Sequence, residues 1–200
     1  MLEKKTLEFL RNLEANNDRE WFQANKEKYE AAKINFAAFI ANVIERIAEF
    51  DDDLRGVEVG QCVFRIFRDV RFSKNKDPYK THFGAFMADG GRKSMNPGYY
   101  LHLDPRQSFI AGGVYRPDPE RLLSIRRAIA ERTDEFLAII SEPHFQKLFG
   151  EVSSHGEQLV KMPPGFPKDH KAGEYLKFKT YIVSRNVSEK EISDPEFVAA

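Results

Sequence analysis

The sequence lacks the features that mark several classes of protein. Its 200 residues include one cysteine, Cys62, so an intramolecular disulfide is excluded. No run of about 18 apolar residues is present, so we expect no transmembrane helix and no membrane contact. The first residues also lack the apolar segment of a secretory signal peptide. Together these absences predict a cytoplasmic protein.

Common motifs of catalysis and cofactor binding are missing as well. There is no glycine-rich phosphate loop or dinucleotide fingerprint, no paired-cysteine or His-Glu-x-x-His zinc motif, and no Gly-x-Ser-x-Gly elbow. We therefore expect no cofactor and no metal. A metal shared by His82 and His102 is a minor alternative, because they lie in segments that we expect to be neighbouring strands but no further ligand is evident.

The chain has no net charge, but its charge is unevenly distributed. Lysine and arginine number 31, and so do aspartate and glutamate. Residues 1–60 carry a net charge of −4, residues 61–116 a net charge of +6, and residues 117–200 a net charge of −2. The basic centre favours a local surface for an anion, whereas the neutral total argues against a general nucleic-acid-binding surface. Mutual neutralisation of the centre and its flanks in the fold is an equal alternative.

The first 50 residues have the three-and-four spacing of apolar side chains that predicts amphipathic helices. Thr6 is placed to cap a first helix, and Asp18 to cap a second. The second runs to about Phe50, with a break expected near Lys33 because of its length. Its apolar face from Trp21 to Ile47 suits either the core or the interface of a homodimer.

From residue 57 the pattern changes to the alternation that is typical of strands. The turn Asp104-Pro105-Arg106-Gln107 predicts a hairpin, and strands joined so tightly must be antiparallel. We expect strands over residues 57–59, 61–72, 80–88, 98–103, 108–115 and 178–187.

Helical patterns return after Pro117 and continue to Gly150, and Ser188 and Glu191 have the spacing of a capping box. A last helix that begins at Asp194-Pro195 would have only a few residues, which predicts that the complete protein continues further. Helices, then strands, then helices predict an α+β fold. We expect a single domain over residues 1–200, with N-terminal helices packed on a mainly antiparallel sheet and further helices C-terminal to it.

The segment from Arg65 to Lys80 carries the clearest functional signal, with six cations and two acids. On an ideal strand Arg65, Asp69 and Arg71 share a face, so the carboxylate can orient two guanidinium groups toward an anion. A purely structural Arg–Asp network on the sheet is the alternative. The candidate ligand-binding residues are Arg65, Arg68, Asp69, Arg71, Lys76, Tyr79, Lys80 and His82.

This segment also carries a resemblance to a known family. The pattern Arg-x-x-Arg-Asp-x-Arg-Phe, then Asn-Lys and Tyr, is matched by Arg65, Arg68, Asp69, Arg71, Phe72, Asn75, Lys76 and Tyr79. With residues 16–22 and 163–170, it resembles domain-of-unknown-function family 2461, which occurs in bacteria and within longer chains in fungi. The resemblance implies no particular activity, cofactor or catalytic residue, but it draws attention to these positions.

Four functions are compatible with these residues. We favour a module that binds a phosphate- or carboxylate-bearing small molecule through the basic segment. The second is a metal-independent hydrolase or transferase that uses the same residues on an anionic substrate, with His82 as general base. Nucleic-acid binding is disfavoured by the neutral total charge. In a scaffold protein, the basic row would only hold the sheet together.

Overall fold

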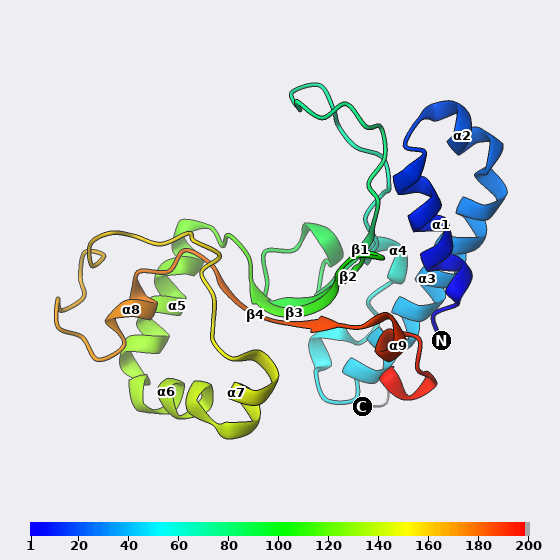
Figure 1. Ribbon diagram of the computed structural model, residues 1–200. Coiled ribbons are helices and arrows are strands. Elements are labelled where there is room, and N and C mark those ends of the chain that lie inside the picture. The colour runs from blue at the N-terminus through cyan, green and yellow to red at the C-terminus, as the bar shows by residue number, and fades with distance from the viewer. Residues whose placement is uncertain (199–200) are drawn as a thin grey trace. The chain divides into compact units, whose positions relative to one another are not determined.

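The computed structural model describes residues 1–198, and its contacts define two compact units (Figure 1). Unit 1 comprises Met1–Ser94, Tyr99–Ile110 and Asn186–Ala200, and unit 2 comprises Met95–Gly98 and Ala111–Arg185. Strands β3 and β4 each contribute residues to both units. The single domain over residues 1–200 stays a prediction.

The fold combines helices with a four-stranded sheet, so the α+β prediction is confirmed. The strands follow one another in the order β1-β2-β3-β4, and β1 pairs antiparallel with β2. The strands are β1 Phe83–Met87, β2 Gly98–Leu103, β3 Ser108–Val114 and β4 Tyr181–Val187. The α-helices are α1 Lys4–Ala15, α2 Arg19–Ala24, α3 Lys26–Ile47, α4 Val59–Cys62, α5 Pro119–Glu131, α6 Thr133–Ser141, α7 Pro143–Phe149, α8 Gly173–Leu176 and α9 Glu189–Ile192. Short 3-10 turns lie at Asp52–Leu54, Gly91–Lys93 and Pro195–Val198.

The N-terminal helices follow the sequence pattern, with two corrections. Asp18 caps α2 as predicted, since its side chain accepts a hydrogen bond of 2.8 Å from the Trp21 amide. The long helix is interrupted at Asn25 and not near Lys33. Thr6 does not cap α1, because the helix already begins at Lys4 and the buried Thr6 hydroxyl lies 2.7 Å from the side-chain oxygen of Asn35.

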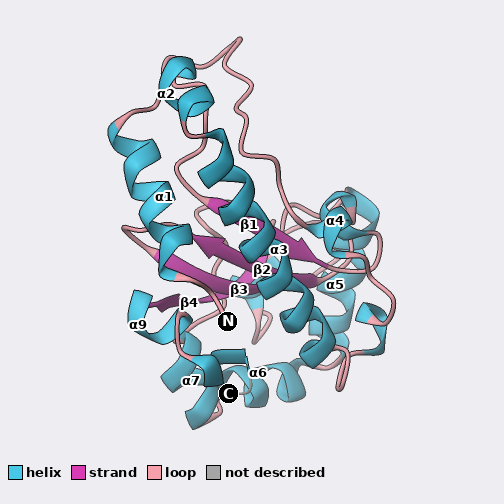
Figure 2. Cartoon of the chain, turned by 90° about the vertical axis from the view of Figure 1, so that its right-hand side faces the viewer, coloured by secondary structure: helices cyan, strands magenta, loops and turns pink. Residues whose placement is uncertain are grey.

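Helices α1 and α3 cross one face of β1 and β2, as Figure 2 shows. Phe36 of α3 packs on Phe83 of β1 with ring centroids 5.2 Å apart, and Leu101 and Leu103 of β2 are buried in the same core. Because side chains alternate along a strand, Tyr100 and His102 lie on the opposite face of β2. The apolar face of α3 therefore packs in the core of unit 1. A homodimer stays a prediction.

The predicted strands at 57–59 and 61–72 are wrong. Residues 59–62 form helix α4. The segment that follows forms no continuous strand within residues 1–198, and it makes the isolated bridges Val63↔Ala85, to β1, and Phe67↔Tyr79. Four residue steps separate the bridges on one side and six on the other, so the register shifts between them. Two extra residues on one side interrupt the ladder of hydrogen bonds, as a β-bulge does. The alternating pattern could not reveal this insertion.

Unit 2 has a hydrophobic core of its own. Asp118 caps α5 by accepting a hydrogen bond of 2.9 Å from the Arg121 amide, and Gly150 ends α7 as predicted. The buried residues Ile129, Leu176 and Phe178 belong to this core.

The C-terminal segment keeps its predicted cap. Ser188 and Glu191 form the capping box of α9, and a 3-10 turn follows at Pro195–Val198. The predicted continuation through Ala199 and Ala200 lies outside the described residues. Among residues 1–198, no helix is both long and apolar enough to cross a membrane.

Candidate functional site

The basic segment forms a loop that extends away from the sheet in Figure 1. We call residues 64–82 the basic loop, residues 68–77 its tip, and residues 64–67 and 78–82 its base. The two sides of the loop are joined by backbone hydrogen bonds. One of 2.8 Å runs from the Lys80 amide to the Ile66 carbonyl within the base, and one of 2.9 Å runs from the Arg68 amide to the Pro78 carbonyl where the base meets the tip. The base is therefore an irregular two-stranded ribbon that carries the tip.

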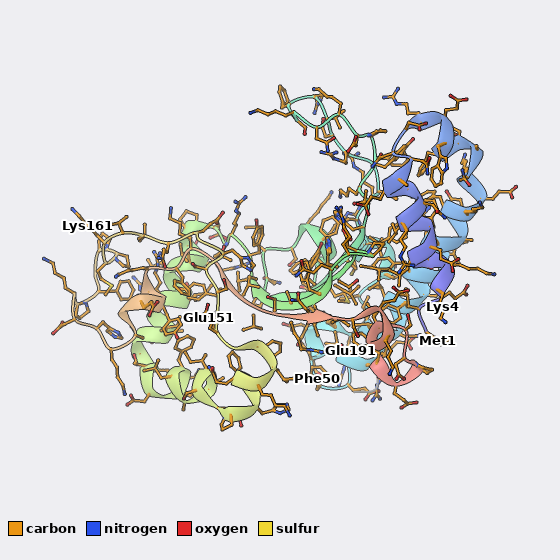
Figure 3. All side chains as sticks on the ribbon, in the orientation of Figure 1. Met1, Lys4, Phe50, Glu151, Lys161 and Glu191 are labelled. Atoms are coloured by element: carbon orange, nitrogen blue, oxygen red, sulfur yellow. The ribbon has the colours of Figure 1, made fainter. Side chains whose placement is uncertain are left out.

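Of the predicted row of Arg65, Asp69 and Arg71, only the Arg71–Asp69 pair forms among the described residues, and it is exposed. The Arg71 guanidinium binds Asp69 with a shortest distance of 2.7 Å, and these hydrogen bonds lower the pKa of the Asp69 carboxyl. The charge of Arg65 lowers this pKa further as a smaller effect. Phe72, next to Arg71, is 95% exposed. Nitrogen-tipped side chains project outward from the loop in Figure 3, so they do not converge on an enclosed site.

Two other predicted ligand-binding cations bind the backbone of the tip itself. Arg68 donates a hydrogen bond of 3.1 Å to the Asp77 carbonyl and one of 3.4 Å to the Ser73 hydroxyl. Lys76 donates one of 3.0 Å to the Val70 carbonyl. The hydrogen bonds that Arg68 and Lys76 donate therefore hold the loop closed.

Tyr79 belongs to the core and not to the row of cations. Its ring is 4% exposed and stacks on Phe22 with centroids 3.9 Å apart. The side-chain amide of Asn17 brackets its backbone: Nδ2 donates to the Tyr79 carbonyl at 3.0 Å, and Oδ1 accepts from the Tyr79 amide at 3.2 Å. Tyr79 thus anchors the loop on the α1–α2 connection.

At the base, Arg65 and Lys80 form a second, different group of cations. The Lys80 ammonium lies 5.5 Å from the centroid of the Phe64 ring. Partial burial lowers the pKa of Lys80, and the nearby charge of Arg65 lowers it further. Within residues 1–198, neither Arg65 nor Lys80 forms an ion pair with a carboxylate.

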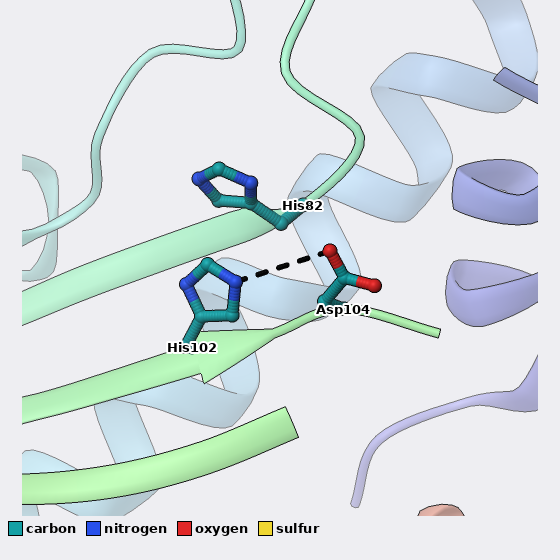
Figure 4. A group of neighbouring side chains, drawn as sticks. All are labelled: His82, His102 and Asp104. Carbon is teal, nitrogen blue, oxygen red and sulfur yellow. Dashed lines mark ion pairs between the residues drawn. The ribbon is translucent and has the colours of Figure 1, made fainter. Parts of the chain in front are cut away.

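His82 follows Lys80 and lies beside β2. Its ring is 4.2 Å from that of His102, and the Asp104 carboxylate completes the group in Figure 4. Burial, and then the charges of His102 and Lys80, lower the pKa of His82 to about 4. Burial also lowers the pKa of His102, so both imidazoles are neutral near pH 7.

Each unit also contains a cavity. The cavity of unit 1, of about 440 Å³, is lined by polar residues of the β2–β3 turn and of the segment around α9, including Asp104 and Ser188. The cavity of unit 2, of about 250 Å³, is lined by Arg116, Arg126 and Lys179, and also by Glu157, which forms an ion pair with Arg116. Arg126 is buried and its Nε has no hydrogen-bond partner among the described residues. The second cavity is therefore a competing place for an anion.

The sequence pattern pairs His82 with His102 but does not point to the other two residues around them. Asp104 was interpreted only as part of a turn, and Tyr100 was not singled out. The sequence did contain one sign that Asp104 lies near His102. The two residues are two positions apart, and this spacing places both side chains on one face of a strand.

The protein thus has an α+β fold, and its ribbon of cations lies next to the pair formed by His82 and His102. The chain matches the family model described as conserved hypothetical protein DUF2461 over residues 5–200, and it belongs to this family. No curated protein and no solved structure matches the chain.

Proposed function

We propose that the protein binds a phosphate- or carboxylate-bearing small molecule at the base of the basic loop, through Arg65 and Lys80. The observation that carries the proposal is that these two neighbouring cations have no ion pair with a carboxylate among the described residues. Partial burial of Lys80 strengthens its attraction for an anion, because water screens it less. An anion bound there would relieve the repulsion between the two cations.

The tip residues have a supporting role in this proposal. Arg68, Arg71 and Lys76 bind groups of the loop itself, so they would shape the base without gripping the ligand. Because the tip cations are bound within the loop, few of them are free to bind phosphate groups. This favours a small anion over a nucleic acid, whose binding needs several free cations along the phosphate backbone. A cytoplasmic location, expected from the single cysteine, belongs to the proposal as well.

An enzyme with His82 as general base is the weaker candidate. A base is most effective when its pKa is close to the working pH. With a pKa of about 4, His82 is free to accept a proton at pH 7 but holds it poorly. Binding needs no proton transfer, and the two cations supply what it does need.

The test is a thermal-shift screen with inorganic phosphate, sulfate, phosphosugars, nucleotides and dicarboxylates. A ligand at about 100 times its Kd adds roughly 2.7 kcal/mol to stability. We expect the shift to disappear in Lys80→Gln and Arg65→Gln and to persist in Arg71→Gln, the matched control from the tip.

Two results would overturn the proposal. One is the absence of a shift with every anion for the wild-type protein. The other is a shift that persists in Lys80→Gln. If it persists there but is lost in Lys179→Gln, the anion binds in the cavity of unit 2.

A further inference from the structure

Three side chains with metal-binding atoms converge on the face of β1 and β2 that α1 and α3 do not cover. His82, His102 and Asp104 each offer one such atom, and the three atoms lie within 4.8 Å of one another. Figure 4 shows the two imidazoles beside each other with the carboxylate next to them. The His102 Nε2 lies 4.0 Å from Oδ2 of Asp104.

The pairing of the strands explains this convergence. β1 and β2 are in register with Phe83 opposite Leu103 and Gly84 opposite His102. One further step in the same register places His82 opposite Asp104, with His102 as its diagonal neighbour. Alternation along β2 keeps His102 and Asp104 on one face. The three residues therefore meet because of backbone geometry.

Neighbouring groups hold His102 in one orientation. The Tyr100 hydroxyl and the Nδ1 of His102 are 3.0 Å apart, and Phe109 stacks on the imidazole at 4.7 Å with an interplanar angle of 16°. A Cβ on Gly84 would lie 2.8 Å from the Tyr100 hydroxyl oxygen, so the glycine makes room for this group. Metal-binding histidines commonly have such a partner on the second ring nitrogen.

Asp104 is oriented in a similar way. Its Oδ1 accepts a hydrogen bond of 2.8 Å from the Arg106 amide, and its Oδ2 is the oxygen nearer to His102. The carboxylate is thus held by the turn while one oxygen stays directed toward the imidazoles. The two imidazoles and the carboxylate therefore offer three metal-binding atoms that lie within 4.8 Å of one another.

We propose that His82, His102 and Asp104 form a binding site for one divalent transition-metal ion of the zinc class. Two imidazoles and one carboxylate suit Zn²⁺ or Co²⁺ better than Mg²⁺ or Ca²⁺, which prefer oxygen ligands. Ligand bonds of about 2.0–2.2 Å require the three atoms to close by roughly 1 Å. Three protein ligands leave a position for water or an anion, as in catalytic zinc sites.

Lys80 lies two residues before His82, and its positive charge repels a metal ion bound there. Lys80 is therefore expected to have opposite effects on the two sites, because it repels a metal ion and attracts an anion. The proposed metal site does not depend on the proposed anion site. Replacing Lys80 by glutamine should strengthen metal binding and weaken anion binding. The two proposals can therefore fail independently.

The experiment is a titration of the untagged full chain with Zn²⁺ by calorimetry, and with Co²⁺ by visible absorption, in a buffer free of phosphate. We expect one ion per chain and a Co²⁺ spectrum without thiolate charge transfer, since Cys62 is buried and not part of the group. Tyr100→Phe should weaken binding about 10- to 100-fold, the usual effect of losing a partner of a metal-bound histidine.

His82→Gln and Asp104→Asn should each weaken binding more than Tyr100→Phe does. In Asp104→Asn, an amide oxygen is still present to accept from the Arg106 amide, so the turn is kept while the charge is lost. His144→Gln, an exposed histidine of α7, is the matched control and should bind as the wild type does. Thermal unfolding without metal checks that each variant is folded.

Absence of binding to the wild-type chain would overturn the proposal. So would binding that is unchanged in both folded variants, His82→Gln and Asp104→Asn. In either case the three residues would serve only as a polar network on the sheet.

Discussion

The tip and the base of the basic loop both carry arginine and lysine, but the tip cations bind groups of the loop itself, whereas the base cations form no ion pair among the described residues. At the tip, Arg71 is exposed and bound to Asp69, and Arg68 and Lys76 bind the loop's own carbonyls. At the base, Lys80 is partly buried over Phe64 and lies near Arg65.

The comparison teaches that charge counted along a sequence is different from charge available to a ligand. A cation in a short loop reaches the carbonyls and carboxylates of that loop easily, because the chain folds back on itself there. A cation on a ribbon held by packing has fewer such partners. This difference between tip and base depends on how firmly the base is held by Tyr79. It can be tested by substitutions at Tyr79, at Gly84 in the neighbouring sheet, and at Arg71 in the tip.

The largest effect is expected from removing the anchor. Tyr79→Ala deletes a buried ring stacked on Phe22 and should destabilise unit 1 by about 3–5 kcal/mol, as other large-to-small aromatic substitutions in cores do. Urea unfolding measures the change, with Tyr79→Phe as the control that keeps the ring. A loss below about 1 kcal/mol, within the range of ordinary substitutions, would show that the base does not depend on this stack.

An intermediate effect is expected at Gly84, where the sheet meets the histidine pair. Gly84→Ala would place a Cβ 2.8 Å from the Tyr100 hydroxyl oxygen and should cost about 1–3 kcal/mol, as overpacking does. The same change in a Tyr100→Phe background should cost less, because the hydroxyl is gone. Equal costs in the two backgrounds, in a double-mutant cycle of unfolding energies, would contradict the contact.

The smallest effect is expected at the tip. Arg71→Gln removes an ion pair whose arginine side chain is 76% exposed, and water screens such pairs strongly. We expect no measurable change in Tm and no change in anion affinity, both read from the same thermal-shift series. A clear fall in Tm would place the Arg71–Asp69 pair among the groups that hold the loop together.

Much of the fold follows from local chemistry that the sequence displays. Asp18 and the Ser188–Glu191 box cap helices as predicted, because capping depends on a few adjacent residues. The strands near 98–103 and 108–114 were predictable from the turn that joins them. These elements needed no knowledge of distant segments.

The structure of the basic loop and its surroundings is determined by contacts between residues that are far apart in the sequence. Such contacts cannot be read from local sequence patterns. The alternation of Phe64 and Ile66 looks like a strand, but the extra residues facing it interrupt the ladder. Tyr79 is one of the predicted ligand-binding residues, yet its ring stacks on Phe22, 57 positions earlier in the chain. Asp104 was interpreted as a turn residue because His82, which it approaches, lies just before β1 and 22 positions earlier in the chain.

The grip of Asn17 on Tyr79 also has a consequence for the order in which the chain is assembled. The side-chain amide imitates a peptide group and takes the place of a neighbouring strand, 62 positions from the residue it holds. During synthesis, α1 and α2 leave the ribosome well before the basic loop, whereas a domain generally folds as a unit. The connection that receives the loop is therefore synthesised first, but its two hydrogen bonds to Tyr79 can form only after the loop has emerged.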